Sequence, residues 1–167
     1  MSLSSRAGSG VPGSVDGLTR ALADHGSGNI SLRQALAPAI RLAEKGFELS
    51  HYEARRFNGY EGLFQSNDAA AAIFIRKDNN PWKKGDKLVQ KDLAKTFKRI
   101  SKYGRDGFYT GPVADLIVAE MKRGNGLISL EDLKNYSSVY RVPVSGTYNG
   151  HEVISMGPPS SGGALLV

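Results

Sequence analysis

The sequence has 167 residues, of which 40% are hydrophobic and 23% are charged, and its formal net charge is +6. This length fits one ordinary domain that buries roughly 70% of its unfolded surface, and no apolar run reaches the ~18 residues that a membrane-spanning helix requires. Because the chain has no cysteine, it can form no disulfide, thiolate metal site or cysteine nucleophile.

Residues 1–10 lack the apolar segment of a signal peptide, and we interpret them as a tag with a flexible lead-in. Beyond them, capping signals predict several helix starts. A Ser followed three residues later by Gln, Glu or Asp can satisfy free N–H groups in the first turn of a helix. The pattern occurs at Ser31, Ser50 and Ser129, and we expect a helix to begin after each.

Apolar repeats at helical spacing predict the remaining helices. The expected helices are Ser14 to Gly26, Ser31 to Gly46 with a kink or a 3₁₀ first turn at Pro38, Ser50 to Phe64, Asn67 to Ala72, Asp86 to Lys102, Pro112 to Gly124 and Ser129 to Tyr136. The inner face of the helix after Pro112 is expected to consist of Val113, Leu116, Ile117 and Met121. We expect Ile73 to Ile75 to be extended and Asn79 to Pro81 to form a turn.

The predicted helix over residues 86–102 is amphipathic and basic. Its inner stripe is Val89, Leu93, Phe97 and Ile100, and its outer stripe is Lys87, Lys91, Lys95, Lys98 and Lys102. Residues 76–105 hold eleven Lys or Arg and three Asp, so this segment carries a charge of +8. A polyanion-binding or nucleic-acid-binding module that uses this helix is therefore an alternative function. A solvated helix face is the favoured interpretation, because the neighbouring aromatic residues do not form a stacking platform.

Two β-type runs, Val142 to Tyr148 and His151 to Met156, flank Asn149-Gly150. An Asn-Gly pair suits a type I′ turn, which needs positive φ at both central residues, so these runs predict a hairpin. The prolines after Gly157 end the second strand, because proline cannot donate to a sheet. Helices followed by a hairpin, without βαβ alternation, indicate an α+β fold that is mostly helical and ends in a β-hairpin.

Ser160 and Ser161 lie between prolines and glycines, without the spacing of a G-x-S-x-G nucleophile turn. We favour a serine that caps a helix over residues 164–167. Binding of a ligand through free N–H groups, or a serine nucleophile, remains as the alternative.

The other candidate residues form no recognisable catalytic or metal-binding set. His25, His51 and His151 make no i, i+4 pair, which gives a zinc site little support. Glu131 and Asp132 are adjacent on a predicted helix and do not face each other as an acid–base pair would. We therefore predict no catalytic, substrate-binding, cofactor-binding or metal-binding residue in this chain.

Six blocks carry a resemblance to a known family: VPGSVDGL (11–18), QALAPAIRLAEKGF (34–47), KKGDKLVQKDLAKTF (83–97), FYTGPVADLIVAEM (108–121), NGLISLEDLKNY (125–136) and PVSGTYNGHEVISMGPPSSGG (143–163). In this order they resemble the large subunit of the gamma-glutamyltranspeptidase family. The resemblance covers residues 11–163, and relatives that act on cephalosporin side chains or poly-γ-glutamate share the blocks.

The resemblance implies an N-terminal-nucleophile hydrolase of αββα architecture that needs no cofactor. Its precursor cleaves itself, and the new N-terminal threonine of the small subunit attacks a γ-glutamyl bond of a glutathione-type substrate. The acyl group then passes to water or to an amino acid. The arginine that holds the substrate carboxylate lies upstream of the VPGSV block. Four threonines of this chain, Thr19, Thr96, Thr110 and Thr147, match no cleavage site.

We therefore interpret residues 11–167 as a partial large-subunit domain, truncated at both ends, that is inactive by itself. Its expected partners are the rest of the large subunit, the small subunit and, in the parent protein, a γ-glutamyl substrate. No nucleic acid and no membrane span in this chain are expected. The family suggests a periplasmic, secreted or cell-surface location.

Overall fold

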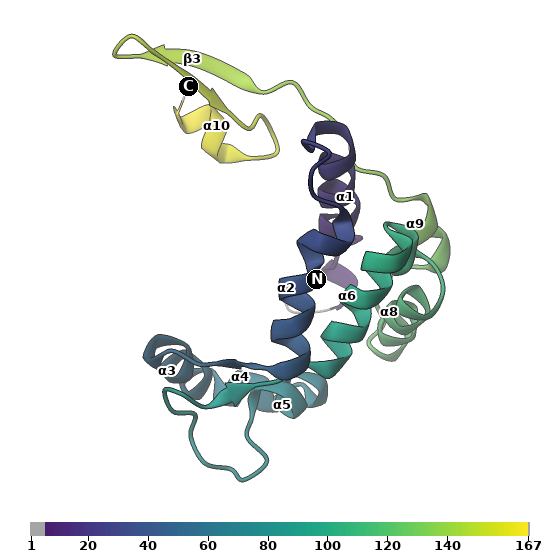
Figure 1. Ribbon diagram of the computed structural model, residues 1–167, viewed down its shortest axis with the longest axis vertical. Coiled ribbons are helices and arrows are strands. Elements are labelled where there is room, and N and C mark those ends of the chain that lie inside the picture. The colour runs from purple at the N-terminus through teal and green to yellow at the C-terminus, as the bar shows by residue number, and fades with distance from the viewer. Residues whose placement is uncertain (1–5, 167) are drawn as a thin grey trace. The chain divides into compact units, whose positions relative to one another are not determined.

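The computed structural model describes residues 6–166 and contains two compact units, residues 1–136 and 137–167. Its described part is mostly helical, with two small antiparallel sheets, so the expected α+β class is confirmed (Figure 1). Residues 1–5, half of the predicted lead-in, lie outside the described residues. None of the described helices combines the length and apolar character needed to cross a bilayer.

The first unit consists of helices and one two-stranded sheet. Its helices are the 3₁₀ turn η1 (Arg6–Gly8), α1 (Ser14–His25), α2 (Leu32–Lys45), α3 (His51–Gly59), α4 (Glu61–Gln65), α5 (Asp68–Phe74), α6 (Lys91–Tyr103), α7 (Asp106–Tyr109), α8 (Pro112–Arg123) and α9 (Leu130–Asn135). Its strands are β1 (Phe47–Glu48) and β2 (Lys87–Leu88), which pair antiparallel. Figure 1 shows α2 and α6 side by side.

The three predicted capping boxes are confirmed. The hydroxyls of Ser31, Ser50 and Ser129 each accept the main-chain N–H of the residue three positions later, and that residue's side chain accepts the serine N–H. Pro112 occupies the first turn of α8, where its missing N–H costs no hydrogen bond. Local sequence therefore determines where these helices begin.

The capping box of α3 leads to a prediction about stability and pH. The pKa of Glu53 is lowered because the Ser50 main-chain N–H donates to its carboxylate, with the Ser50 hydroxyl as the second cause. A carboxylate with a depressed folded-state pKa stabilises the fold above its unfolded value near ~4.3, and this contribution is lost as pH falls through the folded pKa.

We therefore expect Glu53→Gln to destabilise the protein at pH 7 and to have little effect at pH 3, while Ser50→Ala costs about 1 kcal/mol. Urea unfolding at both pH values measures this. The matched control is Glu131→Gln, in the first turn of α9, where the glutamate makes no hydrogen bond or ion pair in the described structure. Equal effects of the two Glu→Gln changes at both pH values would contradict the prediction.

The prediction for the basic helix is wrong at its start. Helix α6 begins at Lys91, and Lys87 and Leu88 belong to strand β2, opposite Glu48 and Phe47. Asp86 caps no helix: its carboxylate accepts the Lys83 main-chain N–H at 2.8 Å. Pairing with a distant strand overrides the helical periodicity of this segment.

The inner stripe predicted for this helix is also wrong in part. Val89 lies before α6, and Leu93 is 38% exposed, whereas the buried residues of α6 are Ala94 and Ile100. The face expected for α8 needs a similar correction, because Leu116 is 71% exposed while Val113 and Ala114 are buried.

Two smaller predictions differ from the structure, and a third, at Pro38, differs in part. Residues Ile73 and Phe74 belong to α5, and only Ile75 is extended. The helix after Ser50 ends at Gly59, and α4 starts separately at Glu61. Helix α2 continues as an α-helix through Pro38, so the alternative of a 3₁₀ first turn is wrong, while the kink stays a prediction.

Two apolar clusters form the core of the first unit. One contains Tyr109, Ala114, Ile128 and Leu133, and thus joins α7, α8 and α9. The other contains Leu49, Ala54 and Leu88, with four aromatic residues packed around it: Phe47, Phe57, Phe74 and Trp82. The second cluster explains why β2 is a strand, since pairing with β1 buries Leu88 beside Leu49.

The second unit contains β3 (Val144–Tyr148), β4 (His151–Ser155) and α10 (Ser161–Leu166). The strands are antiparallel, with Val144 opposite Ser155 and Tyr148 opposite His151. Asn149 and Gly150 both have positive φ, 48° and 77°, as a type I′ turn requires. A helix follows the strands, and it begins at Ser161 rather than Ala164; Val167 lies outside the described residues.

Candidate functional site

A buried ionic cluster links α1, α7 and the segment after α9. Asp16 is the buried charged residue of the described core, and its carboxylate accepts the Arg105 Nε–H at 2.8 Å. Arg105 also donates to the main-chain carbonyls of Lys134, at 2.9 Å, and Tyr136. Its guanidinium carbon lies 4.7 Å from the centre of the Tyr109 ring.

Tyr109 completes this cluster. Its hydroxyl donates to the Pro12 carbonyl and accepts the Asp16 main-chain N–H at 3.2 Å. Its ring stacks on Tyr136 at 5.7 Å, with an angle of 7° between the planes. Burial is the main reason why the pKa of Tyr109 is raised. The hydroxyl therefore stays protonated, and it both donates and accepts a hydrogen bond. This arrangement suits a residue that holds the helices together better than a general acid or base.

A second ionic cluster holds the loop between α5 and β2. Arg76 forms a bidentate ion pair with Asp78, from Nε to Oδ1 at 2.9 Å and from Nη2 to Oδ2 at 2.7 Å, and it also pairs with Asp86. The Arg76 hydrogen bond is the main reason why the pKa of Asp78 lies well below its usual range. The Trp82 ring lies beside the guanidinium, 5.5 Å away.

An open groove of about 560 Å³ adjoins this second cluster. Its lining residues are Ala72, Ile73, Ile75, Arg76, Lys77, Asp78, Trp82, Asp86, Lys87, Leu88 and Val89. The carboxylates in it are already paired with Arg76, so neither is placed as a free base or nucleophile.

Three of the four threonines of this chain form local hydrogen bonds. The hydroxyls of Thr19, Thr96 and Thr110 each donate to a main-chain carbonyl of the preceding helical turn, at 2.7, 3.2 and 2.9 Å. Thr147 lies exposed in β3. None of the four is paired with a side-chain base, as an activated nucleophile needs.

The structure does not bring the sequence-predicted candidates together. Ser161 is the exposed first residue of α10, and the Ser160 main-chain N–H donates to the Gly157 carbonyl at 3.2 Å. The histidines lie on three separate elements: His25 ends α1, His51 starts α3 and His151 starts β4. Within the described residues, no group of three or more His, Asp or Glu could hold a metal ion.

The acidic pair at the start of α9 also has a structural role. The Asp132 carboxylate accepts hydrogen bonds from the Ser129 hydroxyl, at 2.7 Å, and from the Ser129 main-chain N–H, at 2.8 Å. The hydroxyl is the main reason why the pKa of Asp132 is lowered, and the main-chain N–H is the second. Glu131 is exposed beside it. The two carboxylates therefore form no acid–base pair.

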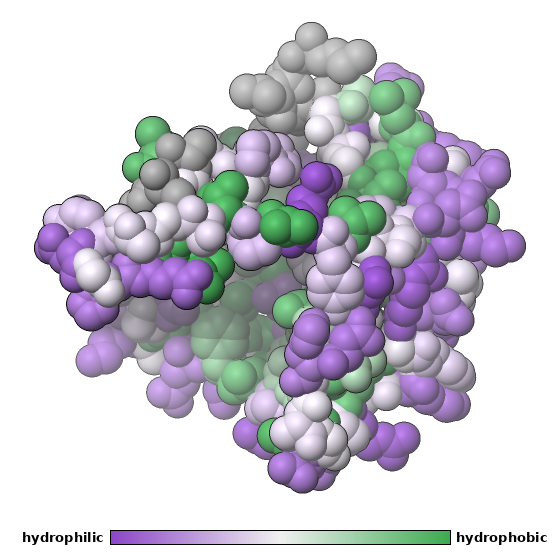
Figure 2. Space-filling model, turned by 90° about the horizontal axis from the view of Figure 1, so that it is seen from above, coloured by the Kyte–Doolittle hydropathy of each residue, from purple (hydrophilic) through white to green (hydrophobic). Residues whose placement is uncertain are grey.

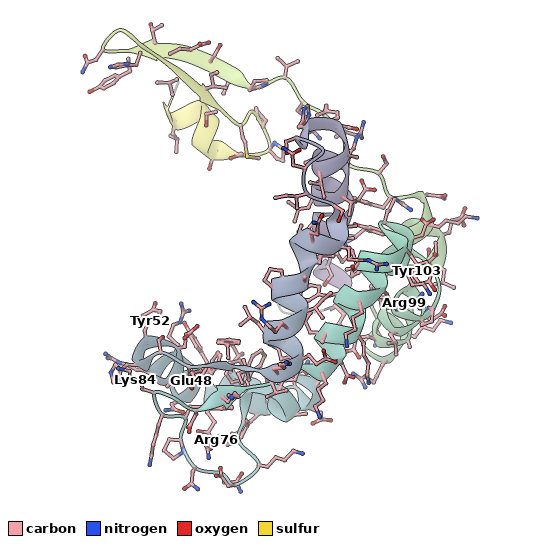
Figure 3. All side chains as sticks on the ribbon, in the orientation of Figure 1. Glu48, Tyr52, Arg76, Lys84, Arg99 and Tyr103 are labelled. Atoms are coloured by element: carbon pink, nitrogen blue, oxygen red, sulfur yellow. The ribbon has the colours of Figure 1, made fainter. Side chains whose placement is uncertain are left out.

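The basic face of α6 is partly neutralised. Lys95 pairs with Asp92 at 2.8 Å on the same helix, and Lys98 pairs with Glu44 of α2. The Lys102 ammonium lies 4.9 Å from the Tyr103 ring centre. Arg99 and Tyr103, labelled in Figure 3, lie together on this helix, with the guanidinium 5.4 Å from the ring. These contacts favour a solvated face that joins α6 to α2.

This interpretation predicts weak DNA binding that does not depend on the lysine face. We expect the triple variant Lys91→Glu, Lys95→Glu, Lys98→Glu to bind duplex DNA as weakly as the unchanged chain in fluorescence anisotropy across a salt series. Steep loss of affinity with salt that disappears in the triple variant would instead support the polyanion-binding alternative.

Sequence reasoning missed the arginine–tyrosine groups, which include Arg99 and Tyr103 of α6. Arg105 and Tyr109 are four residues apart. The same spacing separates Tyr52 from Arg56 on α3 and Arg56 from Tyr60, the residue after α3, and the Arg56 guanidinium carbon lies 5.7 and 5.4 Å from the two ring centres. The i, i+4 spacing places such residues side by side on a helix, and this signal could have indicated these groups.

The geometry of the described residues contains no catalytic set that would indicate a function, but comparison with known proteins indicates the family. The family model described as gamma-glutamyltranspeptidase matches residues 1–167. The "glutathione hydrolase proenzyme" of Escherichia coli K12 is 41% identical over 166 residues, which cover 99% of this chain and 28% of that protein. The "Acylase ACY 1 proenzyme" of Pseudomonas sp. SE83 is 36% identical, over 93% of this chain and 27% of that protein.

A solved structure gives the same result. The gamma-glutamyltranspeptidase of Helicobacter pylori superposes with a TM-score of 0.91 at 41% identity, over 96% of this chain and 46% of that chain. This chain thus spans little more than a quarter of the curated relatives.

Proposed function

This chain belongs to the gamma-glutamyltranspeptidase family, and from that premise we propose that the whole protein cleaves γ-glutamyl amide bonds of glutathione-type substrates. It transfers the γ-glutamyl group to water or to an amino acid. The match over residues 1–167, with 41% identity to a glutathione hydrolase proenzyme, carries this proposal.

In the proposed reaction, a threonine hydroxyl attacks the γ-carbonyl carbon and forms an ester, while the amine of the substrate leaves with a proton. Water or an amino acid then attacks the ester and releases the threonine. The threonine is freed when the precursor cleaves its own chain, so that its α-amine can act as the general base. We place this nucleophile outside the 167 residues: the hydroxyls of Thr19, Thr96 and Thr110 bond to carbonyls of the preceding helical turn, and Thr147 lies inside strand β3 without a side-chain base.

Within this enzyme, residues 11–167 form a supporting part of the large subunit. Their partners are the rest of that subunit and the small subunit, and the complete fold is an αββα N-terminal-nucleophile hydrolase. The proenzyme names of the relatives support the self-processing step, and the saturated ionic clusters support a scaffold role for this segment.

The test compares three preparations in an assay of γ-glutamyl anilide hydrolysis. We expect the whole protein to separate into two subunits on a denaturing gel and to release the aniline. Substitution by alanine of the threonine at the cleavage junction should abolish both processing and release. The 167-residue polypeptide should give only the buffer rate.

Two outcomes would contradict the proposal. One is turnover by the purified 167-residue polypeptide, free of longer forms. The other is a processed whole protein that does not act on any γ-glutamyl amide, peptide or anilide. A cephalosporin side-chain amide is included as a competing substrate, because an acylase proenzyme is 36% identical to this chain.

A further inference from the structure

The dipeptide Asn-Gly occurs three times in the chain, at Asn58-Gly59, Asn125-Gly126 and Asn149-Gly150. An asparagine before a glycine is chemically labile, because the glycine main-chain nitrogen can attack the asparagine side-chain carbonyl carbon and close a five-membered ring. Glycine has no Cβ atom to hinder this approach. Since the three pairs share the same dipeptide chemistry, differences in their reactivity come from the structure around each pair.

The first pair is held inside helix α3. The Asn58 side chain donates to the Trp82 carbonyl at 3.0 Å and accepts the Trp82 main-chain N–H at 2.8 Å. Both Asn58 and Gly59 belong to the helix, and Asn58 is partly buried. Ring closure at Asn58 therefore requires that its side chain leave Trp82 and that the end of the helix open.

The second pair, between α8 and α9, has an engaged nitrogen. The Gly126 main-chain N–H donates to the Met121 carbonyl at 2.7 Å, and Gly126 is partly buried. A Cβ atom added to Gly126 would lie 2.4 Å from the Met121 Sδ atom, which shows how closely this residue is packed. Attack on Asn125 therefore costs a main-chain hydrogen bond and a local rearrangement.

The third pair has neither restraint. Asn149 and Gly150 form the turn between β3 and β4, and both are exposed. Within the described structure, the Asn149 side chain and the Gly150 N–H make no hydrogen bond. Polar residues such as asparagine, in purple in Figure 2, form much of the surface on the face shown there, where water reaches them.

We propose that Asn149 is a site of spontaneous modification, at which aspartate or isoaspartate replaces the asparagine. The Gly150 nitrogen loses its proton to solvent and bonds to the Asn149 side-chain carbonyl carbon. The bond from that carbon to the side-chain nitrogen breaks, and the nitrogen takes up a proton and leaves as ammonia. Water then opens the succinimide ring at one of its two carbonyl carbons. The net reaction consumes one water, releases one ammonia and adds one negative charge.

The isoaspartate product changes the turn itself. Its main chain runs through the former side chain, so it adds one carbon atom to a loop of two residues. A type I′ turn needs two ordinary residues with positive φ, as Asn149 and Gly150 have. Because loop length fixes the register of a hairpin, the pairing of Tyr148 with His151 should be lost in the isoaspartate form.

The test follows the three pairs side by side in the whole protein during incubation at neutral pH. Digestion with pepsin at acidic pH stops the reaction, and peptide mapping measures the mass gain of about 1 Da at each asparagine. We expect Asn149 to be converted at least about tenfold faster than Asn58 or Asn125, since the other two react only through local opening. In urea the three rates should converge.

The control variant is Asn149→Gly, because a Gly-Gly pair also suits a type I′ turn and has no side-chain amide. Its turn peptide should gain no mass, and its strand amides should exchange hydrogen more slowly than those of the isoaspartate form. Conversion of Asn149 in the native protein no faster than that of Asn58 or Asn125 would overturn the proposal. So would a preference for Asn149 that persists in urea, because the structure would then not be its cause. Neither measurement involves γ-glutamyl transfer, so the result is independent of the proposed function.

Discussion

Replacing Arg105 with alanine is expected to lower the free energy of unfolding by about 3 kcal/mol, because it removes the ion pair that Arg105 makes with the buried Asp16 carboxylate. The side chain of Asp16 is 9% exposed and that of Arg105 is 30% exposed. Partial exposure of the arginine weakens the loss, so we place it at the lower end of the range for broken buried pairs. The same change removes the donors to the Lys134 and Tyr136 carbonyls. Urea unfolding at pH 7 measures the loss.

Two further variants separate charge from packing. Arg105→Lys keeps the positive charge but loses the planar guanidinium that reaches three acceptors. It should therefore show a large part of the loss in unfolding free energy expected for Arg105→Ala. The double variant Asp16→Ala, Arg105→Met has no buried charge and should be more stable than Arg105→Ala alone. If Arg105→Ala cost less than about 1 kcal/mol, the pair would behave as a surface salt bridge, and the cluster would not join α1 to α7.

Local signals in the sequence were sufficient for most helix starts. The serine caps at Ser31, Ser50 and Ser129 depend on contacts over three residues, and these contacts are present. Strand β2 could not be predicted in this way, because Leu88 pairs with Phe47, 41 positions earlier. The pairing turned a segment with helical periodicity into a strand and moved the start of α6 to Lys91.

The ionic cluster of Asp16 and Arg105 could not be predicted from the sequence either, because its residues lie far apart along the chain. Asp16 and Arg105 are 89 residues apart, and nothing around Asp16 distinguishes it from an exposed residue of an amphipathic helix. The family was predicted from the order of six blocks and is confirmed by the match over residues 1–167. The blocks near residues 108–121 and 125–136 coincide with the core of α7, α8 and α9, so these blocks reflect packing.

A large effect of adding a single carbon atom is expected at Gly107, which is buried at the contact between α7 and α6. A Cβ atom there would lie 2.4 Å from the Arg99 carbonyl oxygen and 2.6 Å from its carbonyl carbon. These are main-chain atoms, so no side chain can rotate away and α7 has to separate from α6. Gly107→Ala should therefore lower the free energy of unfolding by about 3 kcal/mol.

The matched control for Gly107→Ala is Gly62→Ala in α4. A Cβ atom at Gly62 would meet nothing within 4 Å, and glycine inside a helix costs roughly 0.5–1 kcal/mol relative to alanine. Gly62→Ala should thus raise the stability by up to that amount, so the same substitution is expected to have opposite signs at the two sites. Because Tyr109 follows Gly107 by two residues, Gly107→Ala should also expose Tyr109, which tyrosine fluorescence and hydrogen exchange can detect. An unchanged unfolding midpoint for Gly107→Ala would mean that α7 can move away from α6 at little cost, which is incompatible with Tyr109 as the buried joint of this unit.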